Sequence, residues 1–207
     1  MKYYLIHGID PIRKPFMEDQ FKRFGVTDVT WINGPNKNDV LPNGICDNPT
    51  LPKGHVACTY KHYLILKDIV ENQHPLAVIM EDNIEFRGNV PDAINRYLKD
   101  LPNDWDCVFD SDYFDMKFEG EIRSDCSVYK TGTSKGAHFI LLNLSSATKL
   151  YNSFLPFHEG SDHMYNQLFK KLNMNVYWAE PPNIHKIQRE STWLDDPPKK
   201  RFKWTRR

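Results

Sequence analysis

A group of polar side chains follows a short apolar segment near the middle of the chain. Five consecutive apolar residues, Leu76 to Met80, lead directly into Glu81, Asp82 and Asn83. A short apolar run bounded by a proline indicates a strand that is buried on both faces. Ligands of open α/β sheets bind at the carboxyl ends of the strands, which is where these side chains fall. Hard oxygen ligands suit Mg²⁺ or Mn²⁺, so the segment predicts a metal site, with a solvated acidic turn as the alternative.

A second acidic group follows another predicted strand. The strand is expected at 106–109, and Asp110, Ser111 and Asp112 come directly after it. Residues two apart in an extended segment point to the same side, so the carboxylates of Asp110 and Asp112 are expected to lie together. They can supplement or replace the first group as metal ligands.

Cys58 and His62 stand four residues apart in the segment 54–72, whose apolar residues recur at helical spacing. At this spacing the two side chains share one face of a helix. Two interpretations stay open, a pair of metal ligands or a packed thiol beside a hydrogen-bonded histidine, and the second is the more common arrangement. The four cysteines include no Cys-x-x-Cys pair, which argues against a zinc site and favours free thiols over a disulfide framework.

The other elements alternate between strands and helices. An apolar run at 3–7, a helical stripe at 15–24 and a second apolar run at 26–32 form a βαβ unit, which favours a parallel sheet. The segment 36–53 is rich in Pro, Gly, Asn and Asp and predicts a long surface loop. These features indicate an α/β fold. Further helices are expected at 54–72, 91–101, 145–151 and 163–172, and further strands at 76–80, 106–109, 136–144 and 176–179.

Composition and charge narrow the class of protein. The chain has 207 residues, of which 40% are hydrophobic, and no net formal charge. This length indicates one domain, expected at 1–195, followed by a basic tail or linker at 196–207. Zero net charge argues against a nucleic-acid partner, while the tail offers a weak contact for a membrane surface or a neighbouring domain. No segment has the pattern of a signal peptide or the length of a membrane span, so a cytoplasmic protein is expected.

Several segments, in this order, resemble glycosyltransferase family 25, which includes lipooligosaccharide and collagen galactosyltransferases. Gly54 to His62 resembles a helix start in which a histidine stands four positions after a cysteine. Val78 to Asn83 resembles a strand that runs into Glu-Asp-Asp, with Asn83 in place of the last Asp. Enzymes of this kind also occur in large DNA viruses, so a viral protein in the host cytoplasm is one expectation. Shorter matches are Asp104-Trp105-Asp106, Gly136 to Leu150, Ser161-Asp162-His163 and Gln188 to Thr192.

The resemblance implies a GT-A type fold, a mixed and mostly parallel sheet flanked by helices. It also implies transfer of a sugar, with inversion, from a nucleotide-sugar donor to an acceptor hydroxyl on a glycan or glycoprotein. A UDP-sugar is the expected donor, and Mn²⁺ or Mg²⁺ on Glu81, Asp82 and Asn83 would neutralise the departing diphosphate. The amide of Asn83 brings no charge, so the metal site is expected to be weak. This assignment predicts that Asp82→Ala abolishes metal-dependent turnover and leaves thermal stability nearly unchanged.

Donor-binding residues are expected at strand and helix ends around one crevice. The base and ribose are expected over the ends of the first two strands, near His7, Gly8 and Asn33. Lys61 is expected to face the diphosphate. The remaining residues of the expected nucleotide-sugar site are His62, Glu81 and Asp110.

An inverting displacement needs a carboxylate or histidine that takes the proton of the acceptor hydroxyl. Asp162 precedes a predicted helix and is the expected base, with a plain N-cap as the alternative. Asp112 is the second catalytic candidate. Two other classes stay open: a nucleotide-sugar-binding domain without turnover, suggested by Asn83, and a metal-dependent phosphohydrolase that uses Asp110 and Asp112.

Overall fold

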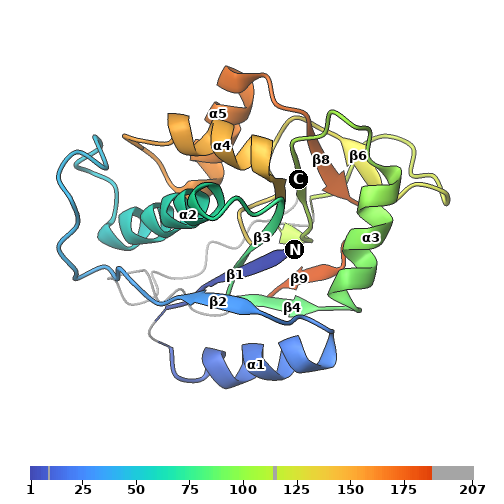
Figure 1. The fold of residues 1–207 in the computed structure, drawn as a ribbon, viewed down its shortest axis with the longest axis horizontal. Coiled ribbons are helices and arrows are strands. Elements are labelled where there is room, and N and C mark those ends of the chain that lie inside the picture. Colours follow the sequence, from blue (N-terminus) through green and yellow to red (C-terminus); the bar gives the residue numbers. More distant parts are fainter. Residues whose placement is uncertain (9, 114–115, 188–207) are drawn as a thin grey trace, which may run out of the picture.

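The computed structural model describes residues 1–8, 10–113 and 116–187 (Figure 1). The strands of its main sheet are β1 (Lys2–Ile6), β2 (Val29–Ile32), β3 (Leu76–Glu81), β5 (Cys107–Phe109), β6 (Val128–Lys130), β7 (Phe139–Asn143) and β8 (Val176–Ala179). Their order in this seven-stranded sheet is β2-β1-β3-β7-β5-β8-β6. β7 and β6 run against the other five, which all share one direction. The predicted mixed, mostly parallel sheet is confirmed.

β3 lies inside the sheet, between β1 and β7. Ala77, Val78, Ile79 and Met80 are all fully buried. Successive side chains of a strand point to opposite faces, so Ala77 and Ile79 join one hydrophobic core and Val78 and Met80 join the other. Burial on both faces is what the unbroken apolar run predicted.

Helices cover both faces of the sheet. α2, α4 and α5 pack on the face that contains Ile79, and α1 and α3 pack on the face that contains Val78. Figure 1 shows the first three gathered on one side of the strands and α1 on the opposite side. The helices are α1 (Arg13–Arg23), α2 (Lys53–Glu71), α3 (Val90–Asp100), α4 (Leu144–Ser153) and α5 (Ser161–Leu172).

A second, two-stranded sheet was not expected from the sequence. It pairs β4 (Ile84–Phe86) with β9 (Ile184–Lys186) in antiparallel fashion. The N–H of Ile187 continues this pairing by donating to the carbonyl of Asn83 at 2.9 Å. This pairing places residues 184–187, at the end of the described chain, across the carboxyl end of β3 and beside the acidic group that follows it.

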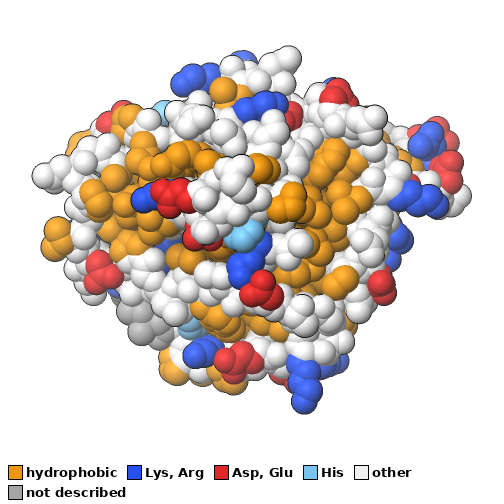
Figure 2. Space-filling model, viewed as in Figure 1, with side chains coloured by type: hydrophobic (Ala, Val, Ile, Leu, Met, Phe, Trp, Pro, Cys, Tyr) orange, Lys and Arg blue, Asp and Glu red, His pale blue; other side chains and the backbone are white. Residues whose placement is uncertain are grey.

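On the face in Figure 2, Lys and Arg side chains lie among Asp and Glu side chains and do not form one extended basic area. Within the described parts of the chain, no helix has the length and apolar character needed to cross a membrane. The basic tail at 196–207 and the segment from Gln188 to Thr192 lie outside the described residues.

Candidate active site

The carboxyl ends of β1, β3 and β5 meet at one edge of the sheet, where the segment before β7 joins them. His7 follows β1, Glu81 ends β3, Asp110 follows β5 and His138 precedes β7. The N–H of Glu81 donates to the carbonyl of His138 at 3.0 Å, which extends the pairing of β3 and β7 to this edge. Side chains that the sequence predicted at separate strand ends are therefore neighbours in space.

Asp82 is buried in a network of hydrogen bonds. Arg13 Nη1 donates to its Oδ1 at 2.7 Å, and its Oδ2 lies 2.7 Å from His7 Nδ1 and accepts the N–H of Gly8 at 3.0 Å. The Arg13 side chain is also buried, 3% exposed, so the two charges compensate each other away from water. Asp82 thereby ties the loop after β1 to the start of α1. Its neighbour Glu81 turns to the opposite face, so the predicted metal group divides into two environments.

Lys61 and Asn33 differ in their access to a ligand. Lys61, on α2, is fully buried, and its Nζ donates to the carbonyl of His7 at 2.7 Å. Burial lowers the pKa of Lys61 to about 8, although nearby acidic groups partly oppose that shift. Asn33 follows β2 and is exposed. Lys61 thus links α2 to the loop that contains His7.

Asp110 points into the protein interior. Its Oδ2 accepts the Tyr97 hydroxyl at 2.7 Å, and its Oδ1 accepts the N–H groups of Asn183 and Ile184 at 2.8 and 3.2 Å. Burial raises the pKa of Asp110 to about 6, against the opposing effect of these hydrogen bonds. Asp110 fastens the start of β9 to the end of β5 and does not face the same environment as Asp112.

Asp112 lies nearer the surface and has three partners. Arg87 Nη2 donates to it at 2.6 Å, His185 Nδ1 lies against the same oxygen, and the N–H of Lys186 donates to its other oxygen at 2.9 Å. Burial acts to raise the pKa of Asp112, but these hydrogen bonds and nearby positive charges outweigh burial and lower it. Asp112 therefore holds β9 against the loop after β5.

Glu81 faces α2, where Cys58 and His62 occupy one face of the helix. The Cys58 thiol lies 4.0 Å from Glu81 Oε1, and His62 Nε2 lies 3.4 Å from the same oxygen. His138 Nε2 lies 3.9 Å from the other oxygen, Oε2. Burial acts to raise the pKa of Glu81, and His138, His62 and Lys186 more than offset it, so the pKa lies below its usual value. Burial also lowers the pKa of His138 to about 4.

Gly136 makes room for the buried imidazole of His138. Its φ of +73° is a conformation that favours glycine, and a Cβ there would lie 2.6 Å from His138 Nδ1 and 3.0 Å from the Tyr113 ring. The Tyr113 and His138 rings pack with centroids 4.7 Å apart. Among the described residues, no group makes a hydrogen bond to His138 Nδ1 or to the buried Oδ1 of Asn83.

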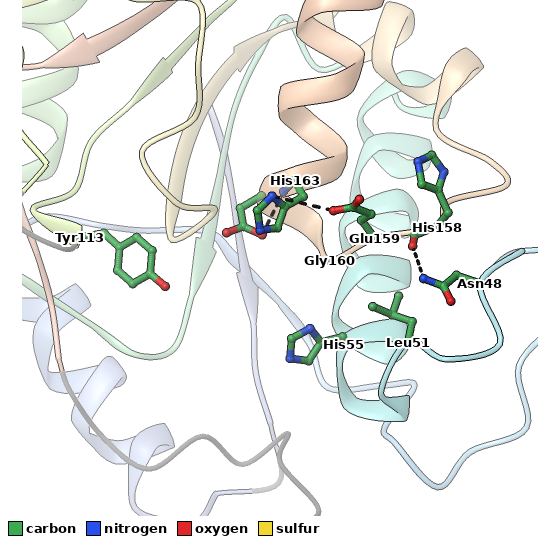
Figure 3. Close-up of a pocket in the computed structure, with 9 residues that line it drawn as sticks. Asn48, Leu51, His55, Tyr113, His158, Glu159, Gly160 and His163 are labelled. Carbon is green, nitrogen blue, oxygen red and sulfur yellow. Dashed lines mark hydrogen bonds and ion pairs between the residues drawn. The ribbon is translucent and has the colours of Figure 1, made fainter. Parts of the chain in front are cut away.

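Asp162 lies in the first turn of α5 and lines an open cavity of about 440 Å³. Figure 3 shows this cavity between the start of α2 with His55, the start of α5, and Tyr113 on the far side. Asp162 Oδ1 accepts the N–H of His163 at 3.0 Å, and the residue at the N-cap position is Gly160. Asp162 is thus a first-turn residue and not the N-cap. The other lining residues are Asn48, Leu51, His158 and Glu159.

Several residues of this edge were not identified from the sequence as site residues. His138, Tyr113, Arg13 and Lys186 reach it from four different segments of the chain. Gly136 was noted only as part of a family match, although a glycine before an apolar strand is a sign that a side chain or ligand approaches closely. The other four residues stand in segments that have no recognisable motif. Only the three-dimensional structure shows that they lie at this edge of the sheet.

The family of the chain follows from a match over residues 13–165 to the model of glycosyltransferase family 25 (LPS biosynthesis protein). The chain belongs to glycosyltransferase family 25. The matched segment includes α2, β3, β5 and the start of α5, and with them Glu81 and Asp162. The predicted family and the predicted glycosyltransferase class are confirmed. No curated protein sequence matches the chain.

Solved structures are similar to this family 25 chain at low sequence identity. The crystal structure of A197 from STIV covers 86% of the chain and 81% of its own length, with a TM-score of 0.52 and 12% identity. A Drosophila β-1,4-galactosyltransferase 7 mutant in complex with manganese, UDP-Gal and xylobiose covers 91% and 72%, with a TM-score of 0.47 and 8% identity. The first likeness shows a shared fold. Family membership and the mostly parallel sheet flanked by helices agree with the predicted GT-A type fold.

The described residues offer a site for a divalent metal, but not the all-oxygen set that Mg²⁺ and Mn²⁺ prefer. Asp82 and Asp110 use both carboxylate oxygens in buried hydrogen bonds. The atoms that do converge belong to a thiol, an imidazole and a carboxylate: those of Cys58, His62 and Glu81, all within 4.8 Å of one another. This candidate set differs in kind from the Glu81, Asp82 and Asn83 set expected from the sequence.

Proposed function

We propose that this family 25 chain is an inverting transferase that moves a sugar from a UDP-sugar to an acceptor hydroxyl on a glycan or glycoprotein. The observation that carries the proposal is the open cavity of about 440 Å³ with Asp162 in its lining. A cavity of this size suits a small-molecule ligand, and its amide, imidazole and carboxylate groups suit the hydroxyls of a sugar.

Asp162 is the proposed general base. It stands in the first turn of α5, where the N-terminal end of the helix dipole favours negative charge. Among the described residues, only the N–H of His163 donates to this carboxylate, and only to Oδ1, so the carboxylate keeps acceptor capacity for a sugar hydroxyl. A carboxylate on one side of the anomeric carbon and a leaving group on the other is the arrangement that inversion requires.

Lys186 is proposed to stabilise the departing diphosphate. Its Nζ lies 3.7 Å from the centroid of the Tyr113 ring, and Tyr113 lines the cavity. Burial lowers the pKa of Lys186, while the charges of Glu81 and Asp162 act in the opposite direction. An ammonium beside the Tyr113 ring, at the cavity wall, supplies positive charge where a leaving group develops negative charge.

The remaining predicted residues take supporting roles in this proposal. His7, Gly8 and Asn33 stay the proposed contacts for the base and ribose. Asp112 is proposed as a positioning residue, because its hydrogen bond to the Lys186 N–H fixes the strand that carries this lysine. Lys61 is proposed to hold the loop after β1 through the carbonyl of His7.

A donor screen tests the function. The chain is incubated with nucleotide-sugars and a series of divalent cations, and release of the nucleoside diphosphate is measured with and without glycan acceptors. Asp162→Asn is expected to lower kcat by about 10²–10⁴-fold, because general-base catalysis contributes that much, and to leave donor binding unchanged. Full activity of Asp162→Asn would contradict its role as the base.

A matched control uses a second aspartate in the first turn of a helix. Asp92 occupies this position in α3, is exposed, and lies on the other face of the sheet. Asp92→Asn changes the same chemical group in the same helical context, so its turnover should equal that of the parent chain.

The two competing functions are read out in the same screen. A phosphohydrolase would cleave phosphoesters without any acceptor, but both oxygens of Asp110 already accept hydrogen bonds in the interior, which does not favour it. A binding domain would retain the donor and release no nucleoside diphosphate with any acceptor.

A further inference from the structure

Cys58, His62 and Glu81 meet where α2 packs against the end of β3. Cys58 and His62 stand one helical turn apart, and Glu81 is the last residue of the strand opposite them. One ligand atom from each lies within 4.8 Å of the other two. Three side chains that can bind a metal therefore converge from two elements that the hydrophobic core holds rigidly in place.

The separations between these atoms suit a small transition metal. Bonds of about 2.0–2.3 Å in a tetrahedral zinc site put the ligand atoms roughly 3.3–3.8 Å apart. His62 Nε2 and Glu81 Oε1 lie 3.4 Å apart, and Cys58 Sγ and Glu81 Oε1 lie 4.0 Å apart. The ligand atoms of Cys58 and His62 lie within 4.8 Å of each other, so a shift of up to about 1 Å at the Cys58 side chain, within the reach of a rotamer adjustment, brings the set to bonding distance.

A neighbouring hydroxyl orients the histidine of this cluster. His62 Nδ1 lies 3.2 Å from the Tyr165 hydroxyl, and both residues are fully buried. With Nδ1 engaged by Tyr165, Nε2 faces Glu81. Histidines that bind metals commonly use one ring nitrogen for the metal and the other for such an outer partner.

The chemistry of the ligands selects the type of metal. Thiolate and imidazole groups favour Zn²⁺ and similar transition metals, whereas Mg²⁺ and Mn²⁺ favour carboxylates, carbonyls and water. The Glu81 side chain keeps 16% of its surface exposed, which leaves a path for a cation from solvent. Three protein ligands leave a fourth position for water or a ligand oxygen, as in catalytic zinc sites.

We propose that Cys58, His62 and Glu81 form a binding site for Zn²⁺ or a transition metal of similar preference, such as Co²⁺, at the carboxyl end of β3. The site selects these ions over Mg²⁺ and Mn²⁺. Cation binding here does not depend on whether the chain transfers a sugar, so each proposal can fail without the other.

Cobalt titration of the full chain, stripped of metal by a chelator, tests the site directly. Bound Co²⁺ should give the near-ultraviolet charge-transfer band of a cobalt–thiolate bond, and Zn²⁺ should displace it while excess Mg²⁺ or Mn²⁺ should not. Cys58→Ser should remove the band and weaken Zn²⁺ binding about 100-fold or more. Cys126→Ser is the matched control, because Cys126 is also a half-buried free thiol but donates to the carbonyl of Val128 on β6, the last strand of the sheet, with β7, β5 and β8 between it and β3.

Tyr165→Phe separates a metal site from simple packing. It removes only the hydroxyl beside His62 Nδ1 and should weaken Zn²⁺ binding about 10-fold, as loss of an outer partner does. If Cys58→Ser does not fold, as judged by circular dichroism, Tyr165→Phe and the parent spectrum decide the question. The proposal is wrong if bound Co²⁺ shows no thiolate band, or if Tyr165→Phe, or a folded Cys58→Ser, binds Zn²⁺ as tightly as the parent and the Cys126→Ser control.

Discussion

The acidic groups after β3 and after β5 look alike in the sequence but have different surroundings. After β5, Asp110 and Asp112 each accept backbone N–H groups of the β9 segment and so hold the small sheet against the main one. After β3, Asp82 is buried with an arginine, and Glu81 faces a thiol and two imidazoles.

The difference lies in what fills the acceptor positions of each carboxylate. A buried carboxylate whose two oxygens both accept N–H or O–H groups of the protein holds those segments together and has fewer acceptor positions left for a ligand. Glu81 instead has neighbours that are themselves potential metal ligands, at distances longer than strong hydrogen bonds. Of the acids at these two strand ends, Glu81 has the surroundings of a binding residue.

The largest loss of stability is expected for Asp82→Ala, which tests whether Asp82 stabilises the fold. The change leaves Arg13 buried without its closest partner, and breaking a buried ion pair in this way costs about 3–5 kcal/mol. Urea unfolding measures the loss. The hypothesis that Asp82 is a metal ligand predicted an unchanged stability for the same variant.

A double variant distinguishes the loss of the ion pair from a general loss of packing. Asp82→Ala combined with Arg13→Met removes both charges, so its loss of stability should be smaller than the sum of the two single losses. Additive losses would mean that the two residues do not stabilise the fold as a pair.

The pH dependence of stability should have opposite signs at Asp110 and Asp112. The folded-state pKa of Asp110 is raised to about 6, so the unfolded chain releases this proton first as the pH rises. The contribution of Asp110 is full below its ordinary pKa and is lost by about pH 6, a change of at most about 3 kcal/mol. Asp112 has a lowered pKa, so its contribution is present above its ordinary pKa and is lost as the pH falls.

Urea unfolding across this pH range compares the parent with Asp110→Asn and Asp112→Asn. Asp110→Asn should remove a decrease in stability between about pH 4 and 6, and Asp112→Asn should remove part of the loss in acid. Identical pH profiles for the parent and Asp110→Asn would show that this carboxyl is not buried as described.

The smallest loss of stability is expected for Arg87→Ala, because Arg87 pairs with Asp112 near the surface. The Arg87 side chain is 49% exposed, and an ion pair of this kind contributes about 1 kcal/mol or less. Thermal unfolding at low and high salt measures the change, which should shrink as salt screens the pair. A loss as large as that of Asp82→Ala would remove the distinction between the buried and exposed pairs.

The sequence by itself determined the elements and the direction of their side chains. The unbroken apolar run Leu76 to Met80 predicted a strand buried on both faces, and all but its first residue are fully buried. Alternation along an extended segment explains why Glu81 and Asp82 point in opposite directions. Helical spacing predicted that Cys58 and His62 share a face, and both turn toward Glu81.

The tertiary structure decided which side chains become partners. Glu85 and His185 pair in a sheet although they stand far apart in the chain, and His138 reaches Glu81 only because β7 runs against β3. The sequence did not predict the second sheet, the burial of Lys61 or the place of the Glu81 carboxylate beside Cys58 and His62. Local spacing fixes where one residue points, but contacts between distant segments depend on how the whole chain packs, and no local pattern encodes them.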